Sequence, residues 1–229
     1  MRFKRFLQKG DLTKLGVGGW TPPGIVANFL EALNVAGFSF PEAIVAHSVI
    51  VKAFSLPLMI RNHRMQKRLK LAQPELDHLQ SELTGTKDID KKRAIAVQLR
   101  EAYAKHNCSP MQMLWNAVPQ GVFAISSVLG IKRIADLPMG PMHTPFLWNK
   151  LDAFDPLYVM PVLSIATGAA MIMQNGEALQ KTETKVMLSI GLASSLLFAH
   201  HVPMALWLYF LSNNVITIAQ AFFIKKVLK

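Results

Sequence analysis

This sequence of 229 residues has a single cysteine, Cys108, so it cannot form an intrachain disulfide. It contains no CxxC or HExxH spacing and its seven histidines are scattered, which argues against a zinc centre. We therefore expect no metal-binding or catalytic role for Cys108. No Ser–His–Asp set, phosphate-binding loop or pair of carboxylates within an apolar stretch can be assembled either. The sequence thus predicts a protein that is not an enzyme and needs no cofactor.

Charged residues are also scarce. They make up 17% of the chain, against about 25% in a typical soluble domain, while 51% of the residues are hydrophobic. The charges cluster between apolar stretches, a distribution typical of membrane segments separated by polar loops. The formal net charge is +11, because acidic residues are few. In a membrane protein this excess indicates loop placement and contact with anionic lipid, and we predict no direct nucleic-acid binding.

Five apolar stretches are candidates for spanning a bilayer, and we predict an all-α polytopic membrane protein with about five transmembrane helices. A span needs ~20 apolar residues. The fourth stretch has only 14, so four spans with a re-entrant helix is the alternative. The stretches are residues 43–60, 111–131, 157–173, 186–199 and 205–224.

The sequence lacks tandem repeats and Gly/Ser linkers, which favours one membrane domain over residues 43–229 with one polar insertion at 61–110. Residues 1–42 form an N-terminal segment. Within it, Gly24–Ala36 is apolar but only 13 residues long, so it suits a helix that lies in the interface rather than crossing it.

The insertion at 61–110 contains two helical patterns separated by Thr84-Gly85-Thr86, and Gly is the usual residue at a helix C-terminus. Two amphipathic helices joined by a short turn predict an antiparallel hairpin, either a solvated structural element or a mobile docking element. Pro74 should kink or break the first helix. The apolar stripes are Leu69, Ala72, Leu76, Leu79 and Leu83 in the first helix and Ile95, Leu99 and Tyr103 in the second.

The basic residues predict an orientation. With five spans, the side that holds the insertion and the C-terminus has 16 Lys/Arg, and the other side has 8. Basic loops stay inside, so the hairpin and the C-terminus are expected inside and the N-terminus outside. The first ten residues hold four basic and no acidic side chains, as a remnant of a mitochondrial targeting segment would.

Lys52 is the most informative residue. It lies eight residues before the end of the first apolar stretch, which is roughly 12 Å of depth along a helix. A charge at that depth costs several kcal/mol, so it should face a partner or a water-filled cavity. Ser48 and Ser55 share its helix face, and no Asp or Glu lies within the five stretches. The alternative is that the span boundary is misplaced and Lys52 is interfacial.

The last apolar stretch carries Asn213, Asn214, Thr217 and Gln220, of which the first, third and fourth share one helix face. Such residues either bond neighbouring helices together or line the same wet cavity as Lys52. Weaker polar positions occur in the other stretches, among them Gln120 and Thr167.

Six segments in the same order resemble the YidC–Oxa–Alb family of membrane protein insertases, especially its mitochondrial Oxa branch. The most specific segment is DPLYVMPVLSIAT at 155–167, which is similar to the family's entry to the third span. The others are LGVGGWTPPGIVANFLEALNV (15–35), VKAFSLPL (51–58), QPEL (73–76), KHNCSPM (105–111) and LSNNVITIAQ (211–220).

This resemblance implies a five-span fold around a hydrated, positively charged groove, in which the family's intramembrane Arg is matched by Lys52. Gln120, Thr167, Asn214 and Gln220 would line the groove. The implied partners are nascent or newly imported membrane proteins and the lipid bilayer of the mitochondrial inner membrane. The N-terminus would lie in the intermembrane space, and the hairpin and C-terminus in the matrix.

The chain departs from the family pattern in several places, among them Ser109, which stands where the family has Asn before the second span. Lysine replaces the family's arginine at Lys52, the family's Gln-x-Pro becomes Pro119-Gln120-Gly121, and only five residues follow Ile224. Mitochondrial members usually carry a long basic tail that contacts the ribosome, so the mitochondrial ribosome is the less favoured partner. Two other functions stay open: an inactive structural or assembly subunit, and a transporter or channel with Lys52 as an anion site. The absence of inverted repeats counts against the transporter.

Overall fold

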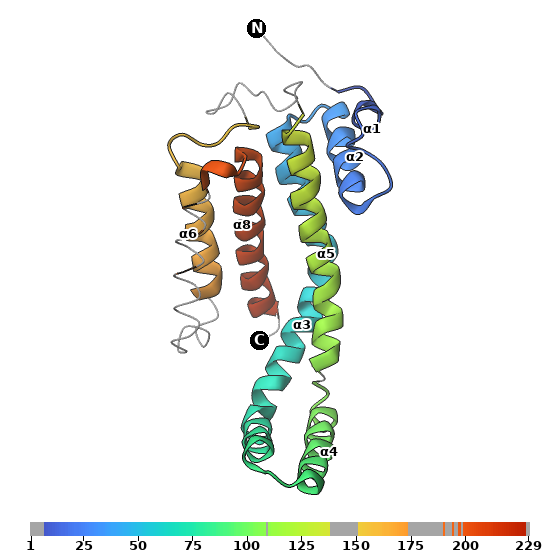
Figure 1. Ribbon diagram of the computed structural model, residues 1–229. Coiled ribbons are helices and arrows are strands. Elements are labelled where there is room, and N and C mark those ends of the chain that lie inside the picture. Colours follow the sequence, from blue (N-terminus) through green and yellow to red (C-terminus); the bar gives the residue numbers. More distant parts are fainter. Residues whose placement is uncertain are drawn as a thin grey trace. The chain divides into compact units, whose positions relative to one another are not determined.

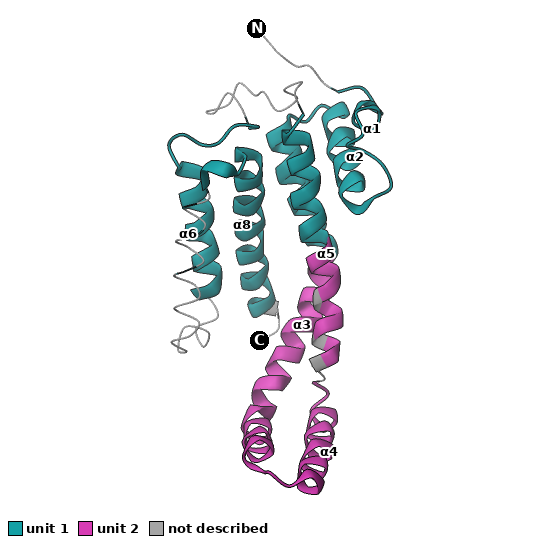
Figure 2. Cartoon of the chain, viewed as in Figure 1, with its two compact units in different colours: residues 1–54, 123–229 teal, residues 55–122 magenta. Residues whose placement is uncertain are grey.

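The computed structural model describes residues 7–108, 110–137, 151–173, 190, 194, 197 and 199–227, and the regular structure of these residues is helical. The chain divides into two compact units (Figure 2). One unit comprises residues 1–54 and 123–229, here called the helical body. The other comprises residues 55–122, here called the hairpin unit.

The elements follow one another along the chain as drawn in Figure 1. They are α1 (Asp11–Lys14), α2 (Pro22–Val35), α3 (Phe40–Gly85), α4 (Ile89–Lys105), α5 (Pro110–Ala135), α6 (Val159–Met173), the 3₁₀ turn η1 (Ala199–His201) and α8 (Met204–Val227).

Three helices are long and apolar enough to cross a membrane: α3, the Leu114–Ala135 part of α5, and the Met204–Lys226 part of α8. They match the first, second and fifth predicted spans. The third predicted span corresponds to α6, a shorter apolar helix of 15 residues. The fourth, 186–199, lies almost entirely outside the described residues.

Helix α3 is longer than predicted. The first span and the first hairpin helix form one continuous helix of 46 residues, with Pro57 and Pro74 inside it. The helix break expected as one outcome at Pro74 does not occur. A proline removes one backbone hydrogen bond, but Pro74 and Lys70 are exposed, so water can bond the carbonyl group that Pro74 leaves open.

The N-terminal segment is tied down by side-chain hydrogen bonds. Thr21 caps α2 by accepting from the backbone N–H of Gly24 at 3.2 Å, and prolines at the first two helical positions need no N–H partner. The buried carboxylate of Glu31 accepts from the N–H groups of Asp11 at 2.7 Å and Leu12 at 3.4 Å. This bond holds the first turn of α1 against α2.

Helix α2 packs into the core of the helical body. Gly130 of α5 allows the close approach, since a Cβ atom there would lie 2.8 Å from the carbonyl oxygen of Pro23 and 2.9 Å from Cβ of Val26. Ile131 and Ile134 are fully buried in the same apolar cluster. With 14 residues α2 is too short to span a bilayer, and its placement in the interface stays a prediction.

The hairpin unit has its own small core between α3 and α4. Ala72 and Leu76 of the predicted first stripe are buried, and Leu69, Leu79, Leu99 and Tyr103 pack against them. Leu83 and Ile95, which were predicted for the same stripes, are half-buried. The sequence patterns did not indicate the other buried members, Met65, Ala102 and Cys108.

Helix α4 is followed by a residue with a left-handed backbone conformation, which terminates the helix. Asn107 has φ of 49°, and its N–H donates to the carbonyl of Ala104 at 3.0 Å. The N–H of Cys108 donates to the carbonyl of Tyr103 at 3.1 Å, which completes a Schellman motif. The motif turns the Cys108 side chain into the hairpin core, so this cysteine has a packing role.

Candidate functional site

Lys52 lies in α3 within the helical body and is half-buried. The surrounding part of α3 is one of the apolar segments long enough to cross a membrane. Phe54, two residues further on, is 80% exposed, so this stretch of α3 presents both a covered and an open face. The location agrees with the predicted cation inside the first span.

Gln220 of α8 contacts α3 at this position. Its Nε2 donates a hydrogen bond of 2.8 Å to the backbone carbonyl oxygen of Lys52. A carbonyl oxygen has two lone pairs and can accept this bond in addition to its helix bond. The Oε1 atom of Gln220 is buried and has no hydrogen-bond partner among the described residues. Gln220 therefore brings a polar group to the lysine.

Asn214 binds the neighbouring helix α6 instead. Its Nδ2 donates to the carbonyl oxygen of Ser164 at 3.0 Å and to Oγ1 of Thr167 at 3.4 Å. Ser164 in turn donates from Oγ to the carbonyl oxygen of Trp207 at 2.9 Å. Helices α6 and α8 lie side by side in Figure 1. Asn214 and Thr167 thus follow the helix-packing interpretation of these polar residues.

Two other predicted residues direct their hydroxyl groups to their own helices. Ser48 is buried and donates to the carbonyl oxygen of Ile44 at 3.0 Å. Thr217 donates to the carbonyl oxygen of Asn213 at 2.7 Å. Such bonds satisfy a hydroxyl without any partner across the helix. The expectation that Ser48 shares a wet stripe with Lys52 gains no support from its contacts.

Ser55 and Gln120 belong to the hairpin unit, where both are half-buried. The structure therefore describes them apart from Gln220 and Asn214. Their predicted role in a groove with Lys52 stays a prediction.

The sequence patterns did not indicate a buried polar cluster around His47, which precedes Lys52 in α3. Nε2 of His47 lies 2.9 Å from Oγ of Ser127, and both residues are buried. The Ser127 hydroxyl also donates to the carbonyl oxygen of Phe123 at 2.8 Å. The rings of Phe29 and Tyr209 flank the imidazole at centroid distances of 5.7 and 6.5 Å. The sequence signal that could have indicated this cluster is a histidine, His47, within an apolar stretch.

Asp155 shapes the entry to α6. Its carboxylate is buried and accepts from the N–H groups of Leu157 at 3.0 Å and Met160 at 2.8 Å. An anion at a helix N-terminus is stabilised by the helix dipole. This contact gives a structural reason for the Asp-Pro-x-Tyr pattern at 155–158.

Within the part of the chain that the structure describes, no three His, Cys, Asp or Glu side chains gather into a possible metal site. Around Gln220 and His47 the structure describes amide, hydroxyl and imidazole groups, which can bind a carboxylate or water.

Comparisons with known proteins give a consistent result. The family model described as 60Kd inner membrane protein matches residues 32–229. The mouse mitochondrial inner membrane protein OXA1L is 26% identical over 220 residues, which are 92% of this chain and 51% of the mouse protein. The chain therefore spans about half the length of that relative.

Bacterial relatives are covered more fully. The membrane protein insertase MisCA of Bacillus subtilis is 28% identical over 194 residues, which are 84% of this chain and 72% of MisCA. The membrane protein insertase YidC 2 of Bacillus anthracis is 30% identical over 196 residues, which are 84% of this chain and 74% of the bacterial protein.

Proposed function

The chain belongs to the family of the 60Kd inner membrane protein, and on this premise we propose that it is a membrane protein insertase. It inserts hydrophobic segments into the bilayer and carries their short polar tails across. The observation that carries this proposal is the half-buried Lys52 in the apolar part of α3, where Gln220 of α8 bonds its backbone. Relatives that are named membrane protein insertases support it.

In the proposed mechanism Lys52 attracts the acidic tail of a substrate into a hydrated groove. At ~5 Å and an effective dielectric of ~20, a carboxylate and an ammonium group attract by about 3 kcal/mol. This is enough to hold the tail transiently and weak enough to release it. A lysine makes a point-charge contact rather than a bidentate one, which favours release.

The contacts divide the candidate residues into two roles. Gln220 is proposed to line the groove with Lys52. Asn214 hydrogen-bonds α6 to α8, and Thr167 accepts the weaker of its two bonds. The hydroxyl groups of Ser48 and Thr217 donate to carbonyl groups of their own helices. The protein does no bond chemistry and uses no cofactor in this proposal.

We place the protein in the mitochondrial inner membrane, as the name of the mouse relative states for that protein. The 16 Lys/Arg on the side of the hairpin and C-terminus, against 8 on the other, orient these parts toward the matrix. The N-terminus then lies in the intermembrane space. The substrates are nascent or newly imported membrane proteins.

The test is insertion into proteoliposomes of two single-span substrates, one with an acidic tail and one with a neutral tail. Lys52→Leu should slow translocation of the acidic tail by roughly tenfold, which corresponds to about 1.4 kcal/mol. Lys52→Arg should retain it. Lys132→Leu, which removes an exposed lysine at the end of α5, is the matched control.

Circular dichroism and gel filtration establish that each variant is folded. Normal insertion of the acidic tail by folded Lys52→Leu would exclude the cation mechanism. If the wild type inserted neither substrate and still supported assembly of a membrane complex, the chain would be the structural subunit considered above.

A further inference from the structure

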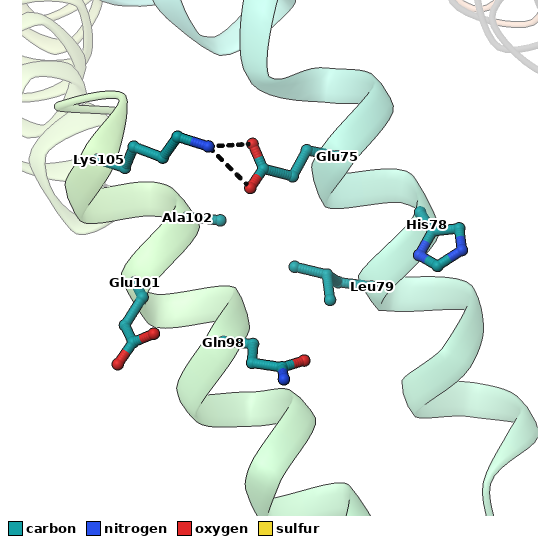
Figure 3. A pocket seen from close by; sticks show the side chains of 7 residues that line it. All are labelled: Glu75, His78, Leu79, Gln98, Glu101, Ala102 and Lys105. Carbon is teal, nitrogen blue, oxygen red and sulfur yellow. Dashed lines mark hydrogen bonds and ion pairs between the residues drawn. The ribbon is translucent and has the colours of Figure 1, made fainter.

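The hairpin unit contains a pocket between α3 and α4. Its volume is about 580 Å³. Figure 3 shows the pocket between the two helices, with Leu79 and Gln98 each directed toward the opposite helix. It is lined by Glu75, His78, Leu79, Gln98, Glu101, Ala102 and Lys105.

The pocket combines an apolar floor with a polar rim. Ala102 belongs to the buried core of the hairpin unit, and Leu79 packs against that core. These two side chains offer an apolar surface. Gln98 adds an amide that can donate and accept hydrogen bonds.

One carboxylate of the rim is already neutralised. Glu75 accepts from Nζ of Lys105 at 3.3 Å and lies 3.0 Å from Nε2 of His106. The hydrogen bond with His106, and next the one with Lys105, hold the pKa of Glu75 below its usual range. Glu75 and Lys105 therefore satisfy each other across the pocket, as the dashed lines in Figure 3 show.

Glu101 is different. It is exposed and makes no hydrogen bond or ion pair with any residue that the structure describes. Its negative charge stands in a segment, 61–110, with 11 Lys/Arg and only six Asp/Glu. Figure 3 shows Glu101 on α4 with its carboxylate directed away from Leu79, so the pocket carries an uncompensated carboxylate at its edge on an otherwise basic hairpin.

This chemistry fits a lysine or arginine next to an apolar residue. The aliphatic stem of such a side chain can lie on Leu79 and Ala102 while its charged end reaches Glu101. Transmembrane segments carry basic residues at the end that stays inside, which is the side where the hairpin is proposed to lie.

We propose that this pocket binds the basic flank of an incoming membrane segment and retains it on the hairpin side. The inference rests on the proposed insertase function and adds a second point of recognition. Lys52 attracts the acidic tail that crosses, and Glu101 holds the basic flank that stays. Because the contact is exposed, it is weak and sensitive to salt.

The insertion test uses two substrates that differ only in the hairpin-side flank, one lysine-rich and one serine-rich. Glu101→Lys should lower insertion of the lysine-rich substrate roughly two- to fivefold at low salt and leave the serine-rich substrate unchanged. Asp77→Lys is the matched control. It makes the same charge change at an exposed position of α3 outside the pocket lining, and it should have no such effect.

Binding is measured separately with the full-length protein in nanodiscs. Fluorescent peptides combine leucines with either lysines or glutamates, and anisotropy reports their binding. Glu101→Lys should weaken binding of the lysine peptide and leave binding of the glutamate peptide no weaker, while Asp77→Lys should not weaken binding of the lysine peptide.

Two results would overturn the proposal: equal binding of the lysine peptide by wild type and Glu101→Lys, or an equal loss in Asp77→Lys. Failure of the wild type to insert either substrate would instead refute the proposed function. The peptide measurement would still decide whether the pocket binds basic segments.

Discussion

The side-chain amide of Gln220 is bonded to the backbone of Lys52, across 168 positions of sequence and at a distance of 2.8 Å. The bond joins α8 to α3 at the residue that is proposed to carry the intramembrane charge. It fixes the backbone beneath the lysine and leaves the ammonium group out of that contact. The position of the charge therefore depends on a helix that is last in the chain.

Gln220→Leu should lower the free energy of unfolding by up to about 1 kcal/mol, the usual value of an interhelical hydrogen bond in a membrane. The buried Oε1 atom without a partner is removed with the amide, which limits the loss. Thermal unfolding in detergent measures the change. Ser212→Ala is the control, because that hydroxyl bonds only to its own helix at Leu208. An equal loss in both variants would argue against a specific contact.

Asn214→Leu and Asn213→Leu form a matched pair on α8. The first removes the bonds to Ser164 and Thr167 and should cost about 1–2 kcal/mol. The second should cost little, since the amide of Asn213 has no hydrogen bond to another described side chain or helix. Chemical or thermal unfolding compares them. If Asn213→Leu were the more destabilising change, α8 would be rotated relative to the structure described above.

Gly130→Ala and Gly121→Ala test the approach of α2 to α5. Both exchanges gain about 1 kcal/mol of helix propensity. Gly121 has open space around a new Cβ atom, whereas at Gly130 that atom would meet the carbonyl oxygen of Pro23 at 2.8 Å. Overpacking costs about 1–3 kcal/mol, so Gly130→Ala should be less stable than Gly121→Ala by that amount. Equal melting temperatures would show that α2 does not pack there.

The contact of Glu75 with Lys105 and His106 predicts a pH effect on the hairpin unit. Because the pKa of Glu75 is lowered, its contribution is fully present above 4.5, its ordinary value, and is lost as the pH falls through the lower folded value. The reactivity of Cys108 reports whether the hairpin unit opens, because this residue is buried in the hairpin core and burial raises the pKa of its thiol. Glu75→Gln should expose Cys108 at neutral pH as strongly as acid does in the wild type.

The measurement is the rate at which Cys108, the chain's single cysteine, is labelled by a pyridyl disulfide, a reagent that reacts with thiols at acid pH. Glu82→Gln is the control, because Glu82 pairs with His78 within α3 and does not connect α3 to α4. Equal labelling of the wild type and Glu75→Gln at neutral pH would show that Glu75 does not close the hairpin.

The sequence predicted the helices that are determined by local features of the chain. Apolar length indicated α5 and α8, and three- and four-residue spacing indicated the Ala72–Leu76 stripe that is buried in the hairpin. Of the two outcomes predicted at Pro74, the continuous helix excludes the break. A proline is tolerated where the carbonyl group it leaves unbonded faces water, and exposure cannot be read from the proline itself.

The sequence predicted which residues belong to the candidate site, but not which partners they contact. Lys52, Asn214 and Gln220 were named from the sequence, but their partners depend on how α3, α6 and α8 pack. The same limit applies to His47, whose partner Ser127 is 80 residues away. Polar residues in a span can bond their own helix, a neighbour or water, and only the neighbours decide which.

The carboxylate of Glu31 lies one position before residue 32, where the match to the family model begins. A protein trimmed to that match would lose Val26, Ala27 and Leu30 and would uncover the apolar end of α5 that they shield. The boundary of the family model therefore cuts through a folding unit, and expression of this chain should start ahead of α1.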